Sequence, residues 1–199
     1  MPWSIIKYDD IEFDDGVRLL CKNAKLTCPN FDRSWACPPV SPLMKDFLGE
    51  FHQFHLVWFV YDLDARCDKM RKLHPDWSDR KCRNPRHYNG TIRAGLESEV
   101  KKFTQKLGAV DDEFVLWSGT CRVCKNKKDG GCTKPSGEPC RYPKRRRYSM
   151  ESSGINVDAT VLKIGLKLEW PPVHKVYQVG LISRGNVHLR KGLSKYASL

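Results

Sequence analysis

The placement of cysteines constrains this chain more than any other feature of its sequence. The 199 residues contain nine cysteines, and seven of them fall in two short segments, 21–37 and 121–140. An odd number cannot be fully paired in disulfides, and clustered cysteines in a reducing compartment more often bind metal. Cys67 and Cys82 stand apart from both segments, and we expect them to be small buried hydrophobes.

The second segment carries the stronger ligand pattern, CRVCKNKKDGGCTKPSGEPCRYP. Cys121 and Cys124 form a CxxC pair that offers two thiolates to one metal centre, and Cys132 and Cys140 each follow after seven further residues. Four thiolates suit a structural zinc ion or an iron–sulfur cluster. Common structural zinc sites join two short-spaced pairs, and only one is present. The spacing therefore favours an iron–sulfur cluster, of the 4Fe-4S type, with zinc as the alternative.

The first segment, CKNAKLTCPNFDRSWACPPVSP, supplies three further candidate ligands, Cys21, Cys28 and Cys37. Trp35, with Phe31 and Pro38-Pro39, is predicted to form an apolar wall that keeps water from a metal. Three ligands are one short of a closed site. Either a fourth comes from Cys82, Cys67, a histidine or a carboxylate, or one iron stays open to substrate. A third interpretation gives the three cysteines a packing role alone.

Positive charge is concentrated on the second cysteine segment. The formal net charge is +12, residues 121–148 contribute +8 of it, and residues 1–62 carry −3. The surface formed by Arg141, Lys144, Arg145, Arg146 and Arg147 is therefore predicted to bind an anionic partner. We expect an acidic protein or enzyme complex. Nucleic acid is the alternative, because Tyr142 and Tyr148 flank this run with rings on which bases could stack.

Periodicity predicts alternating helices and strands in one domain spanning residues 1–199. Residues 54–63 are apolar nearly throughout, as in a central strand, and residues 92–107 carry one apolar stripe typical of a helix. Residues 64–90 are polar and turn-rich, and we interpret them as a basic surface insertion. We further predict strands at 3–13, 114–117 and 173–183, short helices at 43–54 and 156–168, and a basic tail at 184–199. The predicted class is an α/β sandwich, with a mixed sheet of about four strands, helices on one face and two cysteine-rich metal loops.

Several function classes are not supported by the sequence. No apolar stretch approaches the roughly 18 residues of a membrane-spanning helix, and the first residues, MPWSIIKYDD, do not resemble a secretory signal. We therefore predict no membrane partner and a cytoplasmic location. No P-loop or dinucleotide-binding glycine motif is present. The chain is accordingly predicted to be an accessory redox protein more than a free-standing enzyme.

Three elements carry a resemblance to a known family. The stretch Cys28-Pro29-Asn30-Phe31 through Trp35-Ala36-Cys37-Pro38-Pro39 is one, and Leu96-Glu97 to Gly119-x-Cys121-x-x-Cys124 is another. The third is Cys140-Arg141-Tyr142-Pro143 with Ser149-Met150-Glu151 and Gly154-Ile155-Asn156-Val157. Together they resemble the predicted metal-binding, cysteine-rich proteins of anaerobic bacteria and archaea called domain of unknown function 2284. Two departures are the distance from the CxxC pair to Cys132, which is longer than usual for the family, and the insertion 64–90.

The resemblance implies metal binding, with iron–sulfur as the expected form, and no established reaction. The functional prediction is an iron–sulfur protein that transfers electrons, or supplies a cluster, to a partner enzyme complex. A zinc-stabilised basic module that binds nucleic acid or docks on a protein is the alternative. A reductase with an open iron on Cys21, Cys28 and Cys37 is a third hypothesis.

Overall fold

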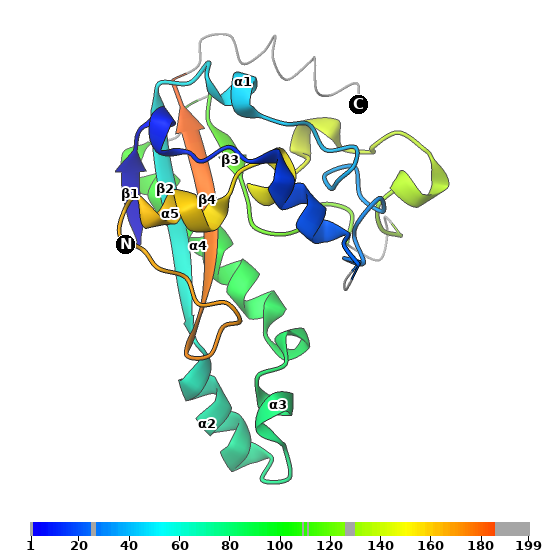
Figure 1. The fold of residues 1–199 in the computed structure, drawn as a ribbon, viewed down its shortest axis with the longest axis vertical. Helices are drawn as coiled ribbons and strands as arrows, with labels where there is room; N and C mark the ends of the chain where they lie inside the picture. The colour runs from blue at the N-terminus through cyan, green and yellow to red at the C-terminus, as the bar shows by residue number, and fades with distance from the viewer. Residues whose placement is uncertain (1, 25–26, 109, 111, 126–129, 186–199) are drawn as a thin grey trace.

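A four-stranded sheet forms the centre of the fold (Figure 1). The computed structural model describes residues 2–24, 27–108, 110, 112–125 and 130–185. The strands are β1 (Trp3–Ile6), β2 (Gln53–Asp62), β3 (Phe114–Leu116) and β4 (Lys175–Arg184), in the spatial order β1-β2-β4-β3. β2 and β4 are the long central pair and match residue for residue along their whole length. The prediction of a central strand at 54–63 is confirmed.

The predicted α/β class with four strands is also confirmed, but the sheet is antiparallel throughout and not mixed. β2 and β3 are connected through helices and run in the same direction. As neighbours they would therefore form a parallel pair. The last strand, β4, inserts between them and runs antiparallel to both. No parallel strand pair therefore forms in the described sheet.

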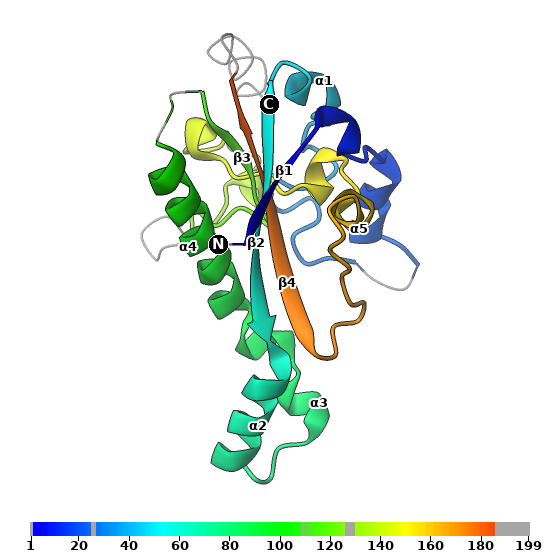
Figure 2. The ribbon, with the colours of Figure 1, turned by 90° about the vertical axis from the view of Figure 1, so that its left-hand side faces the viewer.

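One face of the sheet is covered by the long helix α4 (Asn89–Leu107) (Figure 2). Its buried residues Ile92, Leu96, Val100 and Phe103 are the stripe predicted from the sequence. Gly95 lets the helix approach β2 closely, because a Cβ at this position would lie 2.5 Å from the ring of Phe59. A glycine inside a helix is unfavourable by itself, so its presence here is explained by this contact.

The other face is covered too, which corrects the prediction of helices on one face only (Figure 2). Here lie the short helices α1 (Lys45–Leu48) and α5 (Val157–Leu162) and much of the largest apolar core. Both helices are shorter than predicted. The remaining turns are 3-10 helices at Tyr8–Asp10, Asp15–Cys21, Pro85–His87, Lys134–Ser136, Pro143–Arg145 and Glu151–Ser153.

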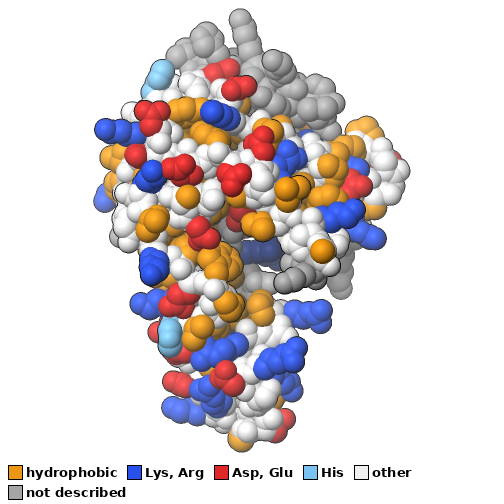
Figure 3. Space-filling model, in the orientation of Figure 1, with side chains coloured by type: hydrophobic (Ala, Val, Ile, Leu, Met, Phe, Trp, Pro, Cys, Tyr) orange, Lys and Arg blue, Asp and Glu red, His pale blue; other side chains and the backbone are white. Residues whose placement is uncertain are grey.

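Residues 64–90, which we predicted as a turn-rich basic insertion on the surface, form a helical lobe at one end of the molecule. Asp62 caps α2 (Leu63–Leu73) and Ser78 caps α3 (Asp79–Cys82), each by accepting a bond from a backbone N–H. The lobe has a small core of its own, in which Cys67 and Cys82 are both 0% exposed. Their predicted role as buried hydrophobes is confirmed. Lys and Arg side chains gather on the outside of the lobe (Figure 3).

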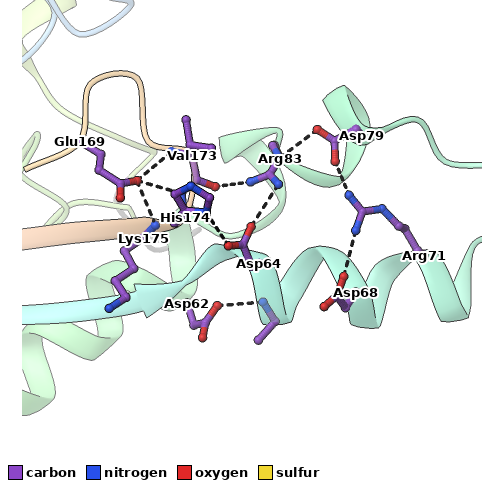
Figure 4. A network of polar contacts seen from close by, with 11 residues as sticks. Asp62, Asp64, Asp68, Arg71, Asp79, Arg83, Glu169, Val173, His174 and Lys175 are labelled. Carbon is purple, nitrogen blue, oxygen red and sulfur yellow. Dashed lines mark hydrogen bonds and ion pairs between the residues drawn. The ribbon is translucent and has the colours of Figure 1, made fainter.

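A polar network fixes the lobe to the start of β4 (Figure 4). Arg83 contacts Asp79 at 2.9 Å and Asp64 at 3.1 Å, and it also donates to the backbone carbonyl of Val173. Asp64 in turn contacts His174 at 2.7 Å. The insertion is therefore part of the folded structure and not a loose appendage.

Two further predictions concern the basic tail and membrane-spanning helices. Of the basic tail 184–199, only Arg184 and Gly185 are described, and the rest lies outside the described residues. Among the described helices, none combines the length and the apolar character needed to cross a lipid bilayer.

Candidate metal centre

The four cysteines of the second segment line one cavity. Its volume is about 170 Å³. The first cysteine segment forms the opposite wall, so two segments that are far apart in the chain meet here. The lining residues are Asn30, Arg33, Ser34, Trp35, Ala36, Thr120, Cys121, Val123, Cys124, Lys125, Gly131, Cys132, Cys140, Tyr142 and Arg146.

Hydrogen bonds within the second segment bring its later cysteines to the cavity. The hydroxyl of Thr133 donates to the carbonyl of Pro139 at 2.9 Å. Thr133 directly follows Cys132 and Pro139 directly precedes Cys140, so the bond joins the two ends of this turn. Arg141 donates to the carbonyl of Gly131 at 2.8 Å and closes the same loop from outside. The seven-residue spacing between the two cysteines is therefore closed into a compact turn.

Trp35 joins the first segment to this turn. Its indole N–H lies 3.2 Å from the hydroxyl of Thr133 and 3.0 Å from the carbonyl of Glu138. Lys134 lies over the indole ring at 5.2 Å and forms an ion pair with Asp32 at 2.9 Å. Of the predicted apolar wall, Trp35 does line the cavity, whereas Phe31 and Pro38-Pro39 do not.

The three cysteines of the first segment form a neighbouring group. The amide N–H of Cys28 donates to the carbonyl of Cys21 at 2.8 Å. Burial raises the pKa of the Cys21 thiol, and the nearby thiols of Cys28 and Cys37 raise it further. Ionised thiols this close together repel one another, and a bound cation would relieve that repulsion.

Cys37 connects this group with the cavity. It is 8% exposed, and its sulfur lies 3.3 Å from the hydroxyl of Thr120, the residue just before Cys121. Burial raises the pKa of the Cys37 thiol and outweighs the hydrogen bonds with Thr120 and Ser34, which lower it; the nearby thiols of Cys28 and Cys121 add smaller upward contributions. Thr120 was missed by sequence reasoning, and its position beside the CxxC pair was the one available signal.

Two of the options for a fourth ligand of the first group are excluded. Cys67 and Cys82 lie in the core of the helical lobe, away from both cysteine segments. A carboxylate is available instead, because Glu151 is close enough to Cys21 to raise the pKa of its thiol. Burial raises the pKa of Glu151 itself.

Cations surround the cavity. Arg33, Lys125 and Arg146 line it. Burial lowers the pKa of Lys125, and the charges of Arg122 and Arg93 lower it further, so these cations lie close to one another. Such an environment favours the net negative charge of a thiolate-ligated metal centre.

Arg146 has a special position among the five predicted partner-binding residues. It donates to the hydroxyl of Tyr148 at 2.7 Å. Burial opposes its charge, but Tyr148 and a hydrogen bond to Cys140 outweigh that effect and raise the pKa of Arg146. This side chain therefore faces the cysteine cavity, which the composition of a basic run could not reveal.

The donor set fits a thiophilic metal. All nine cysteines are free thiols, and four of them share one cavity with cations around it. Soft thiolates select zinc, Cu(I) or iron–sulfur clusters. Within the described ranges, no three Cys, His, Asp or Glu side chains are already arranged to hold a metal ion. The predicted ligands are thus brought together as neighbours and not as a finished coordination sphere.

Fold and cavity together define a cysteine-rich protein built to bind metal. The chain belongs to the family of predicted metal-binding proteins called domain of unknown function 2284, whose sequence model matches residues 4–182. The resemblance seen in the sequence is thereby confirmed. No curated protein and no solved structure matches the chain.

Proposed function

We propose that Cys121, Cys124, Cys132 and Cys140 hold an iron–sulfur cluster, and that the protein transfers electrons, or supplies a cluster, to a partner enzyme complex. The observation that carries this proposal is the convergence of four free thiols on one cation-lined cavity. Such a cluster would supply one-electron redox chemistry. The proposal assumes a reducing cytoplasm, where thiols stay unpaired.

The surrounding residues have definite tasks in this proposal. Trp35 covers the cavity and fixes the turn that carries Cys132 and Cys140. Arg146 donates to Cys140, and hydrogen bonds to cysteine sulfur shift the potential of a cluster. Cys21, Cys28 and Cys37 would form a second centre, either a further relay or an open iron. The proximity of Cys37 to Cys121 supports a short path between the two centres.

Metal analysis of anaerobically purified protein tests the proposal. We expect about four to eight iron and sulfide per chain and a broad absorption band at about 400 nm. Dithionite should bleach the band reversibly. Stoichiometric zinc without iron or sulfide, under the same conditions, would overturn the iron–sulfur proposal and leave the zinc alternative in its place.

That alternative is a zinc-stabilised module that docks on a protein or binds nucleic acid. The basic residues around 141–147 support it. Its nucleic-acid form is weakened by the position of Tyr148, which is 6% exposed and cannot offer a ring to a base. We therefore favour a protein partner for the basic surface.

A further inference from the structure

We propose that a groove beside β3 is the docking site for an extended, acidic segment of a protein partner, which adds to the sheet at Val115. This names the partner chemistry of the proposed function and rests on it for its biological purpose. The groove has a volume of about 360 Å³ and lies between β3 and residues 143–147.

The edge of β3 is open at one residue. β3 is an outer strand of the sheet. Just after it, the N–H of Trp117 donates outward to the carbonyl of Tyr148 at 2.7 Å, and the carbonyl of Trp117 accepts from Met150. Alternate residues of a strand direct their backbone groups to the same edge, so Val115 also points its N–H and carbonyl outward. No group in the described part of the chain bonds to them.

The chain itself stops pairing with this edge where the groove begins. Residues Pro143–Arg145 form a 3-10 turn that carries the basic segment away from β3. Val115 is therefore left facing a groove instead of a neighbouring strand. Unpaired strand edges bind extended peptides through main-chain hydrogen bonds, with side-chain pockets giving specificity.

The groove is lined by apolar and cationic side chains and by Glu113, whose carboxylate pairs with Arg184. Phe114, Trp117 and Val123 are among the apolar residues. Lys144 and Arg145 are exposed, and neither forms an ion pair with a described residue. Arg147 is partly engaged, because it pairs with Glu97 at 2.6 Å and lies 4.3 Å from the ring of Trp117. A partner segment that alternates acidic and apolar side chains complements this surface.

Charge also argues against the chain's own last residues as the occupant. Residues 186–199 include Arg190, Lys191 and Lys195 and no acidic residue. They would be repelled by Lys144 and Arg145. An acidic segment supplied by another protein meets no such repulsion.

The groove is next to the candidate metal centre. Val123 and Arg146 line both the groove and the cysteine cavity. A partner bound in the groove would therefore lie one side chain away from the thiols. That proximity is what electron or cluster transfer requires.

A labelled short peptide of alternating Glu and Val is a suitable probe, added to anaerobically purified protein at low ionic strength. We expect binding by fluorescence anisotropy that weakens with salt, and shifts of the Val115 backbone amide signal by NMR. The double variant Lys144→Glu with Arg145→Glu should weaken binding about tenfold or more. Arg80→Glu, which changes an exposed cation on the helical lobe, is the matched control and should have little effect.

Backbone pairing is tested on the peptide, so that the protein stays unchanged. Peptides N-methylated on one or the other alternate set of amides should differ, with one set abolishing binding. The proposal would be overturned if the two N-methylated peptides bound equally well. Equal binding by a peptide of alternating Lys and Val would also overturn it, as would displacement of the Glu–Val peptide by oligouridine. Iron and sulfide are measured on the same sample. A full iron and sulfide content without peptide binding contradicts the docking proposal alone. Peptide binding by protein that lacks iron and sulfide contradicts the proposed cluster alone.

Discussion

The indole N–H of Trp35 donates to the backbone carbonyl of Glu138 at 3.0 Å. This bond joins the first cysteine segment directly to the turn between Cys132 and Cys140. The two segments are therefore parts of one structural unit, and a change in the first should be felt at the cavity lined by the second.

We predict that Trp35→Phe loosens metal binding without unfolding the protein. Phenylalanine keeps an aromatic ring but loses the single indole N–H that Thr133 and Glu138 share, a loss of about 1 kcal/mol. Metal release to a chelator should be faster, as followed by absorption. Trp170→Phe is the control, because Trp170 is 71% exposed and bonds only to Asp158 among the residues described. Equal release rates for both variants would show that Trp35 does not hold the turn.

Two glycines of α4 should respond in opposite ways to alanine. Gly95→Ala places a Cβ against the ring of Phe59 and should destabilise the fold by about 1–3 kcal/mol. Gly90→Ala meets no atom within 4 Å, and it should be neutral or stabilise the helix by up to about 1 kcal/mol. Denaturant unfolding of both variants measures the difference. Similar effects at the two positions would contradict the close approach of α4 to β2.

Stability should fall in mild acid because of His55. Burial lowers the pKa of this imidazole below 6.5, and the charge of Arg184, itself paired with Glu113, lowers it further. The unfolded chain then binds a proton at a higher pH than the folded chain does, so stability rises with pH. The contribution is complete above about pH 6.5 and is lost as the pH falls from there toward the folded-state pKa.

The variant His55→Phe isolates this effect. Its ring can still contact Trp3 and Phe103, which lie against His55 in the structure. The difference in unfolding free energy between the wild type and the variant should change with pH below about 6.5, while contributions common to both cancel. A constant difference across this range would show that His55 is not the titrating group.

The polar network of the lobe gives a fourth prediction. Arg83→Met removes contacts to Asp79, Asp64 and the carbonyl of Val173 (Figure 4), and should destabilise the lobe by about 1–2 kcal/mol. Arg71→Met removes more exposed pairs and should have a clearly smaller effect. Hydrogen exchange of the α2 amides distinguishes the two. Metal content should be unchanged in both, because the lobe core is separate from the cysteine cavity.

The regular elements could be predicted wherever apolar residues followed a clear period. The central strand β2 and the stripe of α4 were found in this way, because nearly every inward position is apolar. The helices of the lobe were missed because their residues are mostly polar. Their small core is completed by Cys67 and Cys82, and by Val176 of the distant strand β4. Its helices depend on tertiary contacts that no local pattern shows.

For the candidate site, spacing identified the four cysteines that line the cavity but not the residues around them. That Cys121, Cys124, Cys132 and Cys140 lie together could be predicted, because a CxxC pair with two spaced followers is a local signal. The contact of Cys37 with Thr120 and the inward position of Arg146 depend on how distant segments meet. A basic run in a sequence does not show which of its members is exposed and which lines a cavity.

The central claim is that the cavity cysteines hold the iron. Its most direct test is the iron and sulfide content of anaerobically purified Cys132→Ser beside Cys82→Ser, since the second variant changes a cysteine in the lobe core. We predict that Cys132→Ser loses about four iron per chain, whereas Cys82→Ser keeps the wild-type content. Wild-type iron in Cys132→Ser, or equal loss in both folded variants, would contradict the account.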